Sequence, residues 1–493
     1  MIYGFDCVAP ESVGIPSGSI LAFMDRLKAE KRNVHGFLLY RHGKLISKAI
    51  APPYTFDDKR HVYSISKSFT GTAIGIARDE GLLTLGDRLI DIFPESVPEN
   101  ISANLARMTV HDVLSMTCGH PDAAEGCMMG NNDWVKAFLA REVPYTPGTH
   151  FAYNSGGTYM LSAIITKLTG MSMLDYLTPR LFEPLGITGV TWDACPKGIN
   201  LGGWGFRTSP VDMLKLGVLY LNGGYWNGKR IVSRDWVKLA SSYKADNGVD
   251  GGSDWGSGYC YQMWRCQHNC FRGDGMCGQL IIVSPDKDMV LSLISEDNSF
   301  QPICDAYWET IFASAEKNLS TYRMDPYFKE EMTAYDVLPE NPDMLANLRR
   351  AEENWTALEL LVGSEGKYTG TLRLESGMTE SVQVDVDGDC AEFTMTFKNG
   401  LVKKICAGSG TWVRNHYGEF PLTLIEYMVA NPVAPVSLAA SFRMEKNKIF
   451  LNVQCTNSPH GFRIVIDTAA GVITKTRALP PYPVQEIKFT PAE

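Results

Sequence analysis

The sequence predicts a mixed α/β sandwich with an antiparallel sheet, followed by a C-terminal all-β domain. Helical and strand patterns are mixed over residues 1–322, with strand patterns near both ends of this stretch. A polar segment with several prolines follows, and beyond it apolar and polar residues alternate with the period of two that is typical of strands. We therefore expect an α/β domain at 1–322, a linker and helix at 323–362, and an antiparallel β sandwich or barrel at 363–493.

The first domain opens with a predicted hairpin. Residues 36–50, GFLLYRHGKLISKAI, form two apolar runs around His42-Gly43, where glycine permits a tight turn. A helix is expected after Ser64, because apolar residues recur at helical spacing up to Gly81, which suits a helix end. Further elements are expected in this order: helices at 160–170 and 210–224, two strands within 275–295 with a turn at Pro285-Asp286, and a closing helix at 305–319.

The second domain shows strand signals only. A helix is expected before it at 346–361, and three segments then alternate with period two: 381–405, 441–455 and 461–478. Asp387-Gly388 and Asn399-Gly400 are typical hairpin turns within the first of these segments. The domain has no motif that we can assign to chemistry. Whether it shapes the site, binds a partner or stabilises the first domain stays open.

Composition narrows the class of protein. The 493-residue chain is 45% hydrophobic and 20% charged, which is ordinary for a globular protein with a large core. Its net charge of −9 argues against a nucleic-acid partner, since that partner favours a basic surface. There is no apolar run of about eighteen residues, so no membrane span is predicted. The N-terminus does not have the pattern of a signal peptide, and we expect a cytoplasmic protein with reduced thiols.

Four of the twelve cysteines lie close together in the sequence. Cys260, Cys266, Cys270 and Cys277 surround His268. Zinc ligands are usually paired about two residues apart, and these spacings are looser. We therefore expect apolar thiols in preference to a structural zinc, and no metal or cofactor.

A serine lies three residues before a lysine at the start of the first long helix, in HVYSISKSFTGTAIGIARDEG (61–81). Residues three apart share one helix face, so Lys67 can point at Ser64. A desolvated lysine has a lowered pKa and can accept the serine proton, while the helix N-terminus favours negative charge. Alternatively, Ser64 only caps the helix and Lys67 is solvated. The same spacing recurs at Ser241, Ser284, Ser314 and Ser364. Only Ser64 opens a long apolar helix.

A second motif favours the catalytic interpretation. Tyr153-Asn154-Ser155 precedes another predicted helix, and Gly273-Asp274-Gly275 opens a strand pattern in GDGMCGQLIIV. With these motifs the chain resembles the serine β-lactamase and penicillin-binding-protein superfamily, especially its class C-like hydrolases and esterases. That superfamily combines S-x-x-K with Y-x-N or S-x-N and a K-T-G-like strand. The resemblance covers about residues 8–318, and the flanking stretches that match are 83–95, 108–120 and 203–233.

The resemblance implies a β-lactamase/transpeptidase-like fold and acyl transfer through a covalent ester on Ser64. Lys67 and Tyr153 would then move the proton, with an ammonium lowering the pKa of the Tyr153 phenol. The oxyanion would lie between the backbone N–H groups of Ser64 and Met276, and Gly275 would allow the strand to approach closely. The alternative for Tyr153 is a core tyrosine with a satisfied hydroxyl.

The chain also departs from the superfamily pattern. Gly273 stands where lactamases and transpeptidases carry lysine or histidine, and Ser155 stands where asparagine is frequent. The missing cation argues against β-lactams and D-Ala-D-Ala peptides as substrates. Arg272 or Arg207 could contact an anion, although we favour a charge at the surface or behind the site for both. The Ser155 hydroxyl replaces an amide that would orient a substrate carbonyl, and Asn154 is expected to serve the helix start.

Several further side chains are candidates for the pocket. The substrate-binding set that we expect is Met276, Gly275, Ser155, Asp274, His120 and Trp204. Lone histidines are more often structural, which is our interpretation of His61, whereas His120 stays a candidate for the pocket wall. Trp204, Trp255, Tyr261 and Trp264 fall in loops that the superfamily places around its cleft. They would line an apolar acyl pocket or pack in the core.

We therefore expect a metal-free serine hydrolase, an esterase or amidase, that acts on a small ester or amide such as a D-amino-acid amide or peptide. A close alternative is an acyltransferase that passes the same acyl group to an alcohol or amine. An alternative of another class is a non-catalytic sensor that binds a ligand, against which the intact Ser64, Lys67 and Tyr153 count. The oligomeric state stays open.

Overall fold

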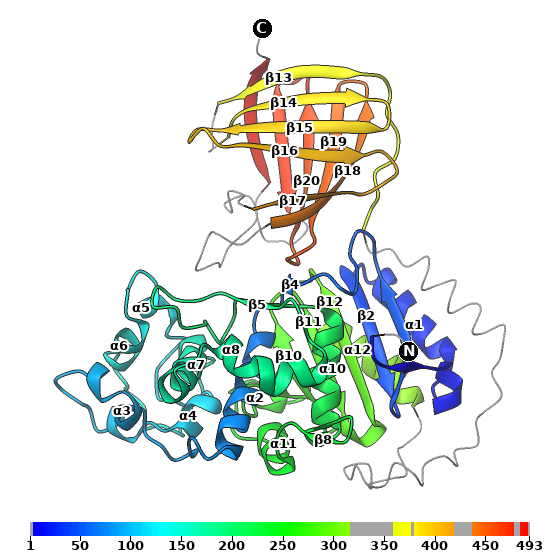
Figure 1. Cartoon of the computed structure of the whole chain (residues 1–493). Coiled ribbons are helices and arrows are strands. Elements are labelled where there is room, and N and C mark those ends of the chain that lie inside the picture. Colours follow the sequence, from blue (N-terminus) through cyan, green and yellow to red (C-terminus); the bar gives the residue numbers. More distant parts are fainter. Residues whose placement is uncertain (1–2, 316–357, 376–378, 419–435, 478–483, 492–493) are drawn as a thin grey trace.

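The computed structural model describes residues 3–315, 358–375, 379–418, 436–477 and 484–491 (Figure 1). The predicted helix at 346–361 lies outside this part of the chain except for residues 358–361, which are not helical. The predicted boundary at 322 and the end of the closing helix also lie outside it. Among the described residues, no helix is long and apolar enough to cross a membrane.

A seven-stranded sheet organises the first domain. In spatial order its strands are β1 (Asp6–Cys7), β3 (Lys44–Ile50), β2 (Val34–Arg41), β12 (Met289–Ser295), β11 (Gln279–Ser284), β10 (Phe271–Gly275) and β9 (Trp264–Arg265). All neighbours are antiparallel except β1 and β3, which confirms the predicted antiparallel sheet. The hairpin turn at His42-Gly43 is also confirmed, and both residues have a positive φ, 51° and 78°.

Helices cover both faces of this sheet (Figure 1). Helices α1 (Ser17–Ala29) and α12 (Gln301–Tyr307) pack on one face, through apolar side chains that include Phe23, Leu291 and Tyr307. Helices α2 (Ile65–Asp79) and α10 (Pro210–Leu221) pack on the other, and α7 (Ser155–Thr169) packs against α2. The sandwich therefore places the start of α2 beside β10.

Three helices differ in length from their predicted ranges. Helix α7 begins at Ser155 instead of residue 160, because Asn154 caps it earlier. Helix α10 ends at Leu221, before the Gly223-Gly224 turn, where both residues have a positive φ. Helix α12 begins at Gln301 and continues as a π-helical turn over Trp308–Phe312.

The remaining elements are short and surround this sandwich. They are α3 (Leu89–Ile92), α4 (Val110–Leu114), α5 (Glu125–Met128), α6 (Trp134–Leu139), α8 (Met173–Leu177), α9 (Glu183–Leu185), α11 (Arg234–Ser241), β4 (Arg60–His61), β5 (Thr191–Trp192), β6 (Phe206–Thr208), β7 (Tyr225–Trp226) and β8 (Lys229–Arg230). Strand β6 pairs with both β4 and β5 in a small sheet.

The second domain is a β-barrel. Its strands are β13 (Tyr368–Leu374), β14 (Thr379–Asp387), β15 (Cys390–Phe397), β16 (Val402–Gly408), β17 (Val413–Tyr417), β18 (Val436–Glu445), β19 (Lys448–Cys455), β20 (Gly461–Asp467), β21 (Val472–Arg477) and β22 (Gln485–Pro491). They form one sheet that closes where β16 meets β18, at Gly408 and Ser441. The sequence left a sandwich or a barrel open, and this closure makes it a barrel.

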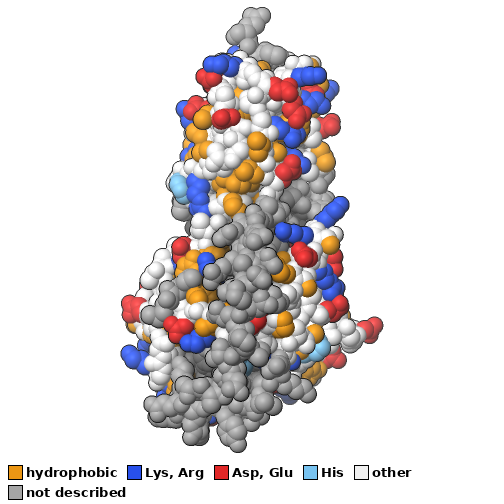
Figure 2. Space-filling model, turned by 90° about the vertical axis from the view of Figure 1, so that its right-hand side faces the viewer, with side chains coloured by type: hydrophobic (Ala, Val, Ile, Leu, Met, Phe, Trp, Pro, Cys, Tyr) orange, Lys and Arg blue, Asp and Glu red, His pale blue; other side chains and the backbone are white. Residues whose placement is uncertain are grey.

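The barrel stands on the end of the α/β domain that carries β4 (Figure 1). The loop between β19 and β20 reaches into that domain, and the His61 N–H donates to the Asn457 carbonyl oxygen at 3.0 Å. Arg414 forms an ion pair with Asp58 across the same junction at 2.8 Å. Figure 2 shows charged side chains of both signs interspersed over the barrel face that it displays.

Candidate active site

Ser64 lies at the turn that begins α2. Its side chain makes no capping hydrogen bond and the residue stays partly exposed, whereas α2 is buried from Ile65 to Ala77. Tyr63, directly before it, has a φ of 48°, a left-handed conformation that is uncommon for a bulky residue. The structure therefore presents the hydroxyl at the end of a buried helix. The alternative in which Ser64 only caps a helix and Lys67 is solvated is wrong.

Lys67 is buried and points at the Ser64 hydroxyl. Its Nζ donates to Ser64 Oγ at 3.1 Å, to Ser155 Oγ at 3.0 Å and to the Gly203 carbonyl oxygen at 2.8 Å. Burial lowers the pKa of Lys67 from 10.5 to about 7, although the Glu125 carboxylate acts in the opposite direction. A substantial neutral fraction at neutral pH makes Lys67 suited to accept a proton from Ser64.

The Tyr153 side chain forms a hydrogen bond with Ser64. Its ring is stacked on Trp264, with centroids 5.4 Å apart, and Lys67 Nζ lies 4.7 Å from the ring centroid. Burial raises the pKa of Tyr153 well above its usual value. The sequence led us to expect an ammonium that lowers this pKa. Because Lys67 approaches the ring face and burial dominates, the phenol is instead protonated and can donate a hydrogen bond.

The residues after Tyr153 anchor the second helix of the site. The Asn154 side-chain oxygen accepts hydrogen bonds from the N–H groups of Gly157 at 2.9 Å and Ala124 at 3.1 Å. Asn154 therefore caps α7, as the sequence indicated. Ser155 begins this helix, and the cap directs its hydroxyl to Lys67.

Strand β10 runs beside residues 62–64, the turn that carries Ser64, which we call the nucleophile turn. A Cβ at Gly275 would collide with the Val62 carbonyl oxygen, so only glycine fits there. The side chains of Tyr63, directly before Ser64, and of Cys277, directly after Met276, also pack against each other. Among the described residues, neither the Ser64 nor the Met276 backbone N–H has an acceptor. Two free N–H groups beside a nucleophile are suited to bind an oxyanion.

Neighbouring side chains crowd Gly273, the position at which related motifs carry a lysine or histidine. A Cβ at Gly273 would lie 2.9 Å from Ser68 Oγ and 3.3 Å from Ile65 Cδ1. A lysine side chain at this position would therefore need its neighbours to move. The neighbouring Arg272 is completely buried and donates to the Asp274 carboxylate at 2.9 Å. Its guanidinium lies against aromatic rings, those of Trp255, Trp264 and Phe300.

Arg207 is buried too, and it pairs with Asp193 at 2.6 Å. For both arginines the sequence favoured a charge at the surface or behind the site, and the structure has the second: each is buried and paired with a carboxylate that neutralises it. His61 Nε2 accepts from the Gly205 N–H at 3.1 Å, which supports its structural interpretation. His120 Nδ1 is 3.1 Å from the Asn154 side-chain nitrogen, and burial lowers the pKa of His120 to about 4.

The aromatic candidates have different surroundings. Trp264 stacks on Tyr153, and Trp255 packs against Trp264 while remaining exposed on one side. Trp204 is nearly buried beside Trp134. Tyr261 lies in the core, where its hydroxyl hydrogen-bonds with His111 at 2.5 Å. The structure brings only part of this set to the nucleophile.

The cysteines near His268 are all buried free thiols. Burial raises the pKa of Cys266 to about 12, so its neutral form is favoured. Among the described residues, no three side chains of the metal-binding types come together.

Two neighbours of the site had no signal in the sequence: the Gly203 carbonyl is a backbone group, and Glu125 lies in a short helix far from either motif. Trp264 was one of four aromatic candidates for the cleft, and the sequence did not distinguish it from the other three. These neighbours are identified only by their contacts in the folded structure.

Residues 23–311 match the model of the Beta-lactamase family. The chain belongs to this family. It is 23% identical over 291 residues to a 6-aminohexanoate-dimer hydrolase of Paenarthrobacter ureafaciens, covering 54% of this chain and 74% of that protein. Protein flp of Staphylococcus aureus strain MW2 is 28% identical over 159 residues, which span about a third of its length (31%) and 31% of this chain.

Solved structures share the fold. A family VIII carboxylesterase superposes with a TM-score of 0.50 at 18% identity, over 63% of this chain and 99% of its own. A putative β-lactamase from Bacteroides dorei DSM 17855 gives a TM-score of 0.50 at 16% identity, over 60% and 98%. The β-lactamase/transpeptidase-like fold is thus confirmed, and the chain is a β-lactamase-related serine hydrolase.

Proposed function

We propose that the protein hydrolyses a small ester or amide through an acyl-enzyme on Ser64. The observation that carries this proposal is the 3.1 Å contact between Lys67 Nζ and Ser64 Oγ, from a lysine whose burial lowers its pKa to about 7. A hydroxyl with an adjacent base is the arrangement that nucleophilic catalysis requires.

Acylation follows from these positions. Neutral Lys67 accepts the Ser64 proton as Oγ attacks the substrate carbonyl carbon, and the N–H groups of Ser64 and Met276 stabilise the oxyanion. When the tetrahedral intermediate collapses, the bond to the leaving group breaks. Lys67 returns its proton through the Tyr153 hydroxyl to the leaving oxygen or nitrogen. Water then attacks the ester in the same way, which releases the acid and restores Ser64.

The substrate class that we propose is small esters and amides that need no carboxylate group for recognition by the site. Gly273 supplies no cation, and Arg272 and Arg207 are neutralised behind the site. This supports simple esters and amides over β-lactams. One relative is named for a 6-aminohexanoate dimer, and we include short amino-acid amides and peptides in the proposal.

A fluorophosphonate probe tests the nucleophile. We expect labelling of the unchanged chain and none of Ser64→Ala, together with turnover of p-nitrophenyl acetate or butyrate. Nitrocefin hydrolysis at a rate similar to ester turnover would contradict the substrate argument. Absence of both labelling and turnover would favour a ligand-binding sensor. Added alcohol that yields a new ester would identify acyl transfer as the preferred second step.

A further inference from the structure

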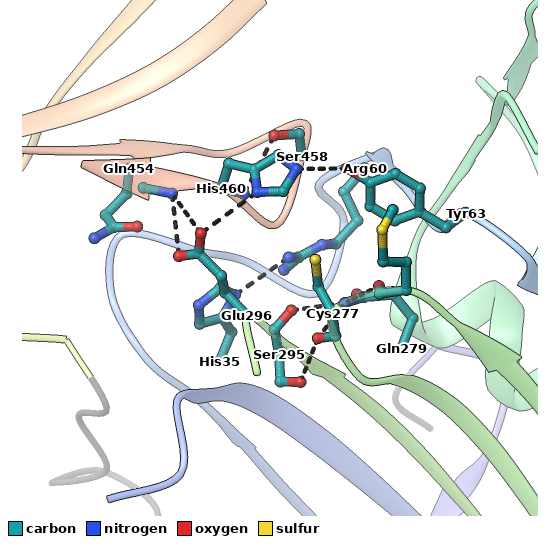
Figure 3. A network of polar contacts seen from close by, with 12 residues as sticks. His35, Arg60, Tyr63, Cys277, Gln279, Ser295, Glu296, Gln454, Ser458 and His460 are labelled. Carbon is teal, nitrogen blue, oxygen red and sulfur yellow. Dashed lines mark hydrogen bonds and ion pairs between the residues drawn. The ribbon is translucent and has the colours of Figure 1, made fainter. Parts of the chain in front are cut away.

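The C-terminal barrel touches the residue that precedes the nucleophile. The Tyr63 hydroxyl lies 2.5 Å from His460 Nε2, and His460 belongs to the loop that joins β19 to β20 (Figure 3). Tyr63 and Ser64 are consecutive, so this contact holds one end of the nucleophile turn. The hydrogen bond is buried, since Tyr63 is 8% exposed and His460 9%.

The barrel also reaches the segment on the other side of the proposed oxyanion hole. The Cys277 carbonyl oxygen accepts hydrogen bonds from Ser295 Oγ at 2.7 Å and from the Asp297 N–H at 3.1 Å. In the sequence Glu296 lies between Ser295 and Asp297. Its two carboxylate oxygens accept hydrogen bonds from the Gly461 N–H at 3.1 and 3.2 Å. Residues next to both Ser64 and Met276 are therefore connected to the same barrel loop.

His460 joins the two connections. Its Nδ1 lies 3.4 Å from the Glu296 carboxylate, while its Nε2 faces Tyr63, as Figure 3 shows. With the proton on Nδ1 directed at Glu296, Nε2 accepts a hydrogen bond from the Tyr63 hydroxyl. One imidazole thus spans the gap between β12 and the nucleophile turn.

The nucleophile turn needs such support. Tyr63 has a φ of 48° and Cys277 a φ of 66°, and non-glycine residues keep this conformation only where surrounding contacts hold it. The edge contact of the Tyr63 ring with His61 and the His61 N–H bond to Asn457 add to the same junction. Small displacements of a nucleophile cost much activity, so contacts that fix this turn matter for rate.

We propose that His460 is a positioning residue of the active site: through Tyr63 it holds Ser64 within reach of Lys67. The barrel then contributes to catalysis by fixing the position of the nucleophile. This inference rests on the proposed function for its kinetic consequence, but the geometry of the turn can be tested separately.

The kinetic test uses the full chain and a fluorophosphonate probe. We expect His460→Ala and Tyr63→Phe each to lower the maximal labelling rate about tenfold, the effect of losing one buried hydrogen bond, with little change in the half-saturating probe concentration. The double variant should be no slower than His460→Ala, because the bond that Tyr63→Phe removes is already absent in His460→Ala. His460→Gln offers a polar atom near Nε2 and should retain most of the rate.

Arg414→Ala is the matched control, because it breaks a contact across the same domain junction that does not touch Tyr63. It should label as fast as the unchanged chain. Labelling of His460→Ala within twofold of the unchanged chain, or no slower than that of Arg414→Ala, would overturn the proposal. If His460→Ala does not fold, Tyr63→Phe carries the test, since its ring still packs on Cys277.

Crystal structures separate this inference from the proposed function. In His460→Ala the distance between Ser64 Oγ and Lys67 Nζ should exceed hydrogen-bonding range, beyond ~3.5 Å, and in Arg414→Ala it should not. An unmoved Ser64 in His460→Ala overturns the inference. If the unchanged chain is not labelled at all, the proposed function fails, and this distance still decides whether His460 positions the turn.

Discussion

Lys67 Nζ lies 3.0 Å from Ser155 Oγ, so a hydroxyl stands here in the place where related motifs often carry an asparagine amide. With Ser64 Oγ and the Gly203 carbonyl oxygen, it completes three acceptors for the three protons of the ammonium. The shorter serine side chain therefore still orients the lysine. A hydroxyl can both accept from an ammonium and donate to a neutral amine, so the contact survives proton transfer.

Ser155→Ala tests this role. Removal of the hydroxyl should lower kcat/KM for p-nitrophenyl acetate about tenfold, because Lys67 loses one of its three partners in a buried site. Ser162→Ala is the matched control: Ser162 is buried in the same helix, and its hydroxyl has no hydrogen-bond partner among the described residues. Equal rates for the two variants would show that the Ser155 contact does not orient Lys67.

The pH profile tests Lys67 as the base. A lowered pKa means that Lys67 is charged below about pH 7 and neutral above it. We therefore expect kcat/KM to rise about tenfold per pH unit up to about pH 7 and then to level off. Ester hydrolysis measured from pH 5 to 9, with the Ser64→Ala rate subtracted at each pH, gives the profile. A rate that still climbs steeply at pH 9 would indicate a lysine with its ordinary pKa of 10.5.

Much of the fold could be predicted because its signals are local. The turn at His42-Gly43, the apolar face of α2 and the period-two strands of the barrel each depend on neighbouring residues. Closure of the barrel could not be predicted, since it depends on a meeting of Gly408 with Ser441 that no local pattern encodes. Helix α7 begins earlier than its apolar period predicts because Asn154 caps it, and α10 ends earlier because the Gly223-Gly224 turn follows it.

The residues of the site that belong to sequence motifs could be predicted. Ser64 and Lys67 are three residues apart, and helix geometry alone brings them together. The Gly203 carbonyl and the His460 contact come from segments that only tertiary packing brings to the site, and a backbone carbonyl has no side-chain signature. The protonation of Tyr153 was missed because it depends on burial, which raises the pKa of the phenol and which the sequence does not report.

Gly275 and Gly273 give a matched pair on one strand. A methyl group at Gly275 would strike the Val62 carbonyl oxygen, a backbone atom that cannot rotate away. Gly275→Ala should therefore lower kcat/KM at least about a hundredfold and destabilise the fold by roughly 1–3 kcal/mol, the usual cost of overpacking. A methyl group at Gly273 meets Ser68 Oγ, a side-chain atom that can rotate, so Gly273→Ala should cost far less.

Steady-state kinetics and urea unfolding of both alanine variants decide this prediction. Similar losses in the two variants would mean that β10 has no special approach to the nucleophile turn at Gly275. A stable Gly275→Ala chain with low activity would localise the damage to the position of the Met276 N–H.

Glu125 adjusts the same lysine through its charge. The carboxylate raises the pKa of Lys67 and so opposes the effect of burial. Glu125→Gln keeps the size of the side chain and removes the charge, so the acidic limb of the kcat/KM profile should move to lower pH by a fraction of a unit. Glu142→Gln is the control, since Glu142 is exposed and is not among the charges that act on Lys67 or Tyr153. A limb that moves to higher pH in Glu125→Gln, or equally in both variants, would rule out Glu125 as the local charge that sets the basicity of Lys67.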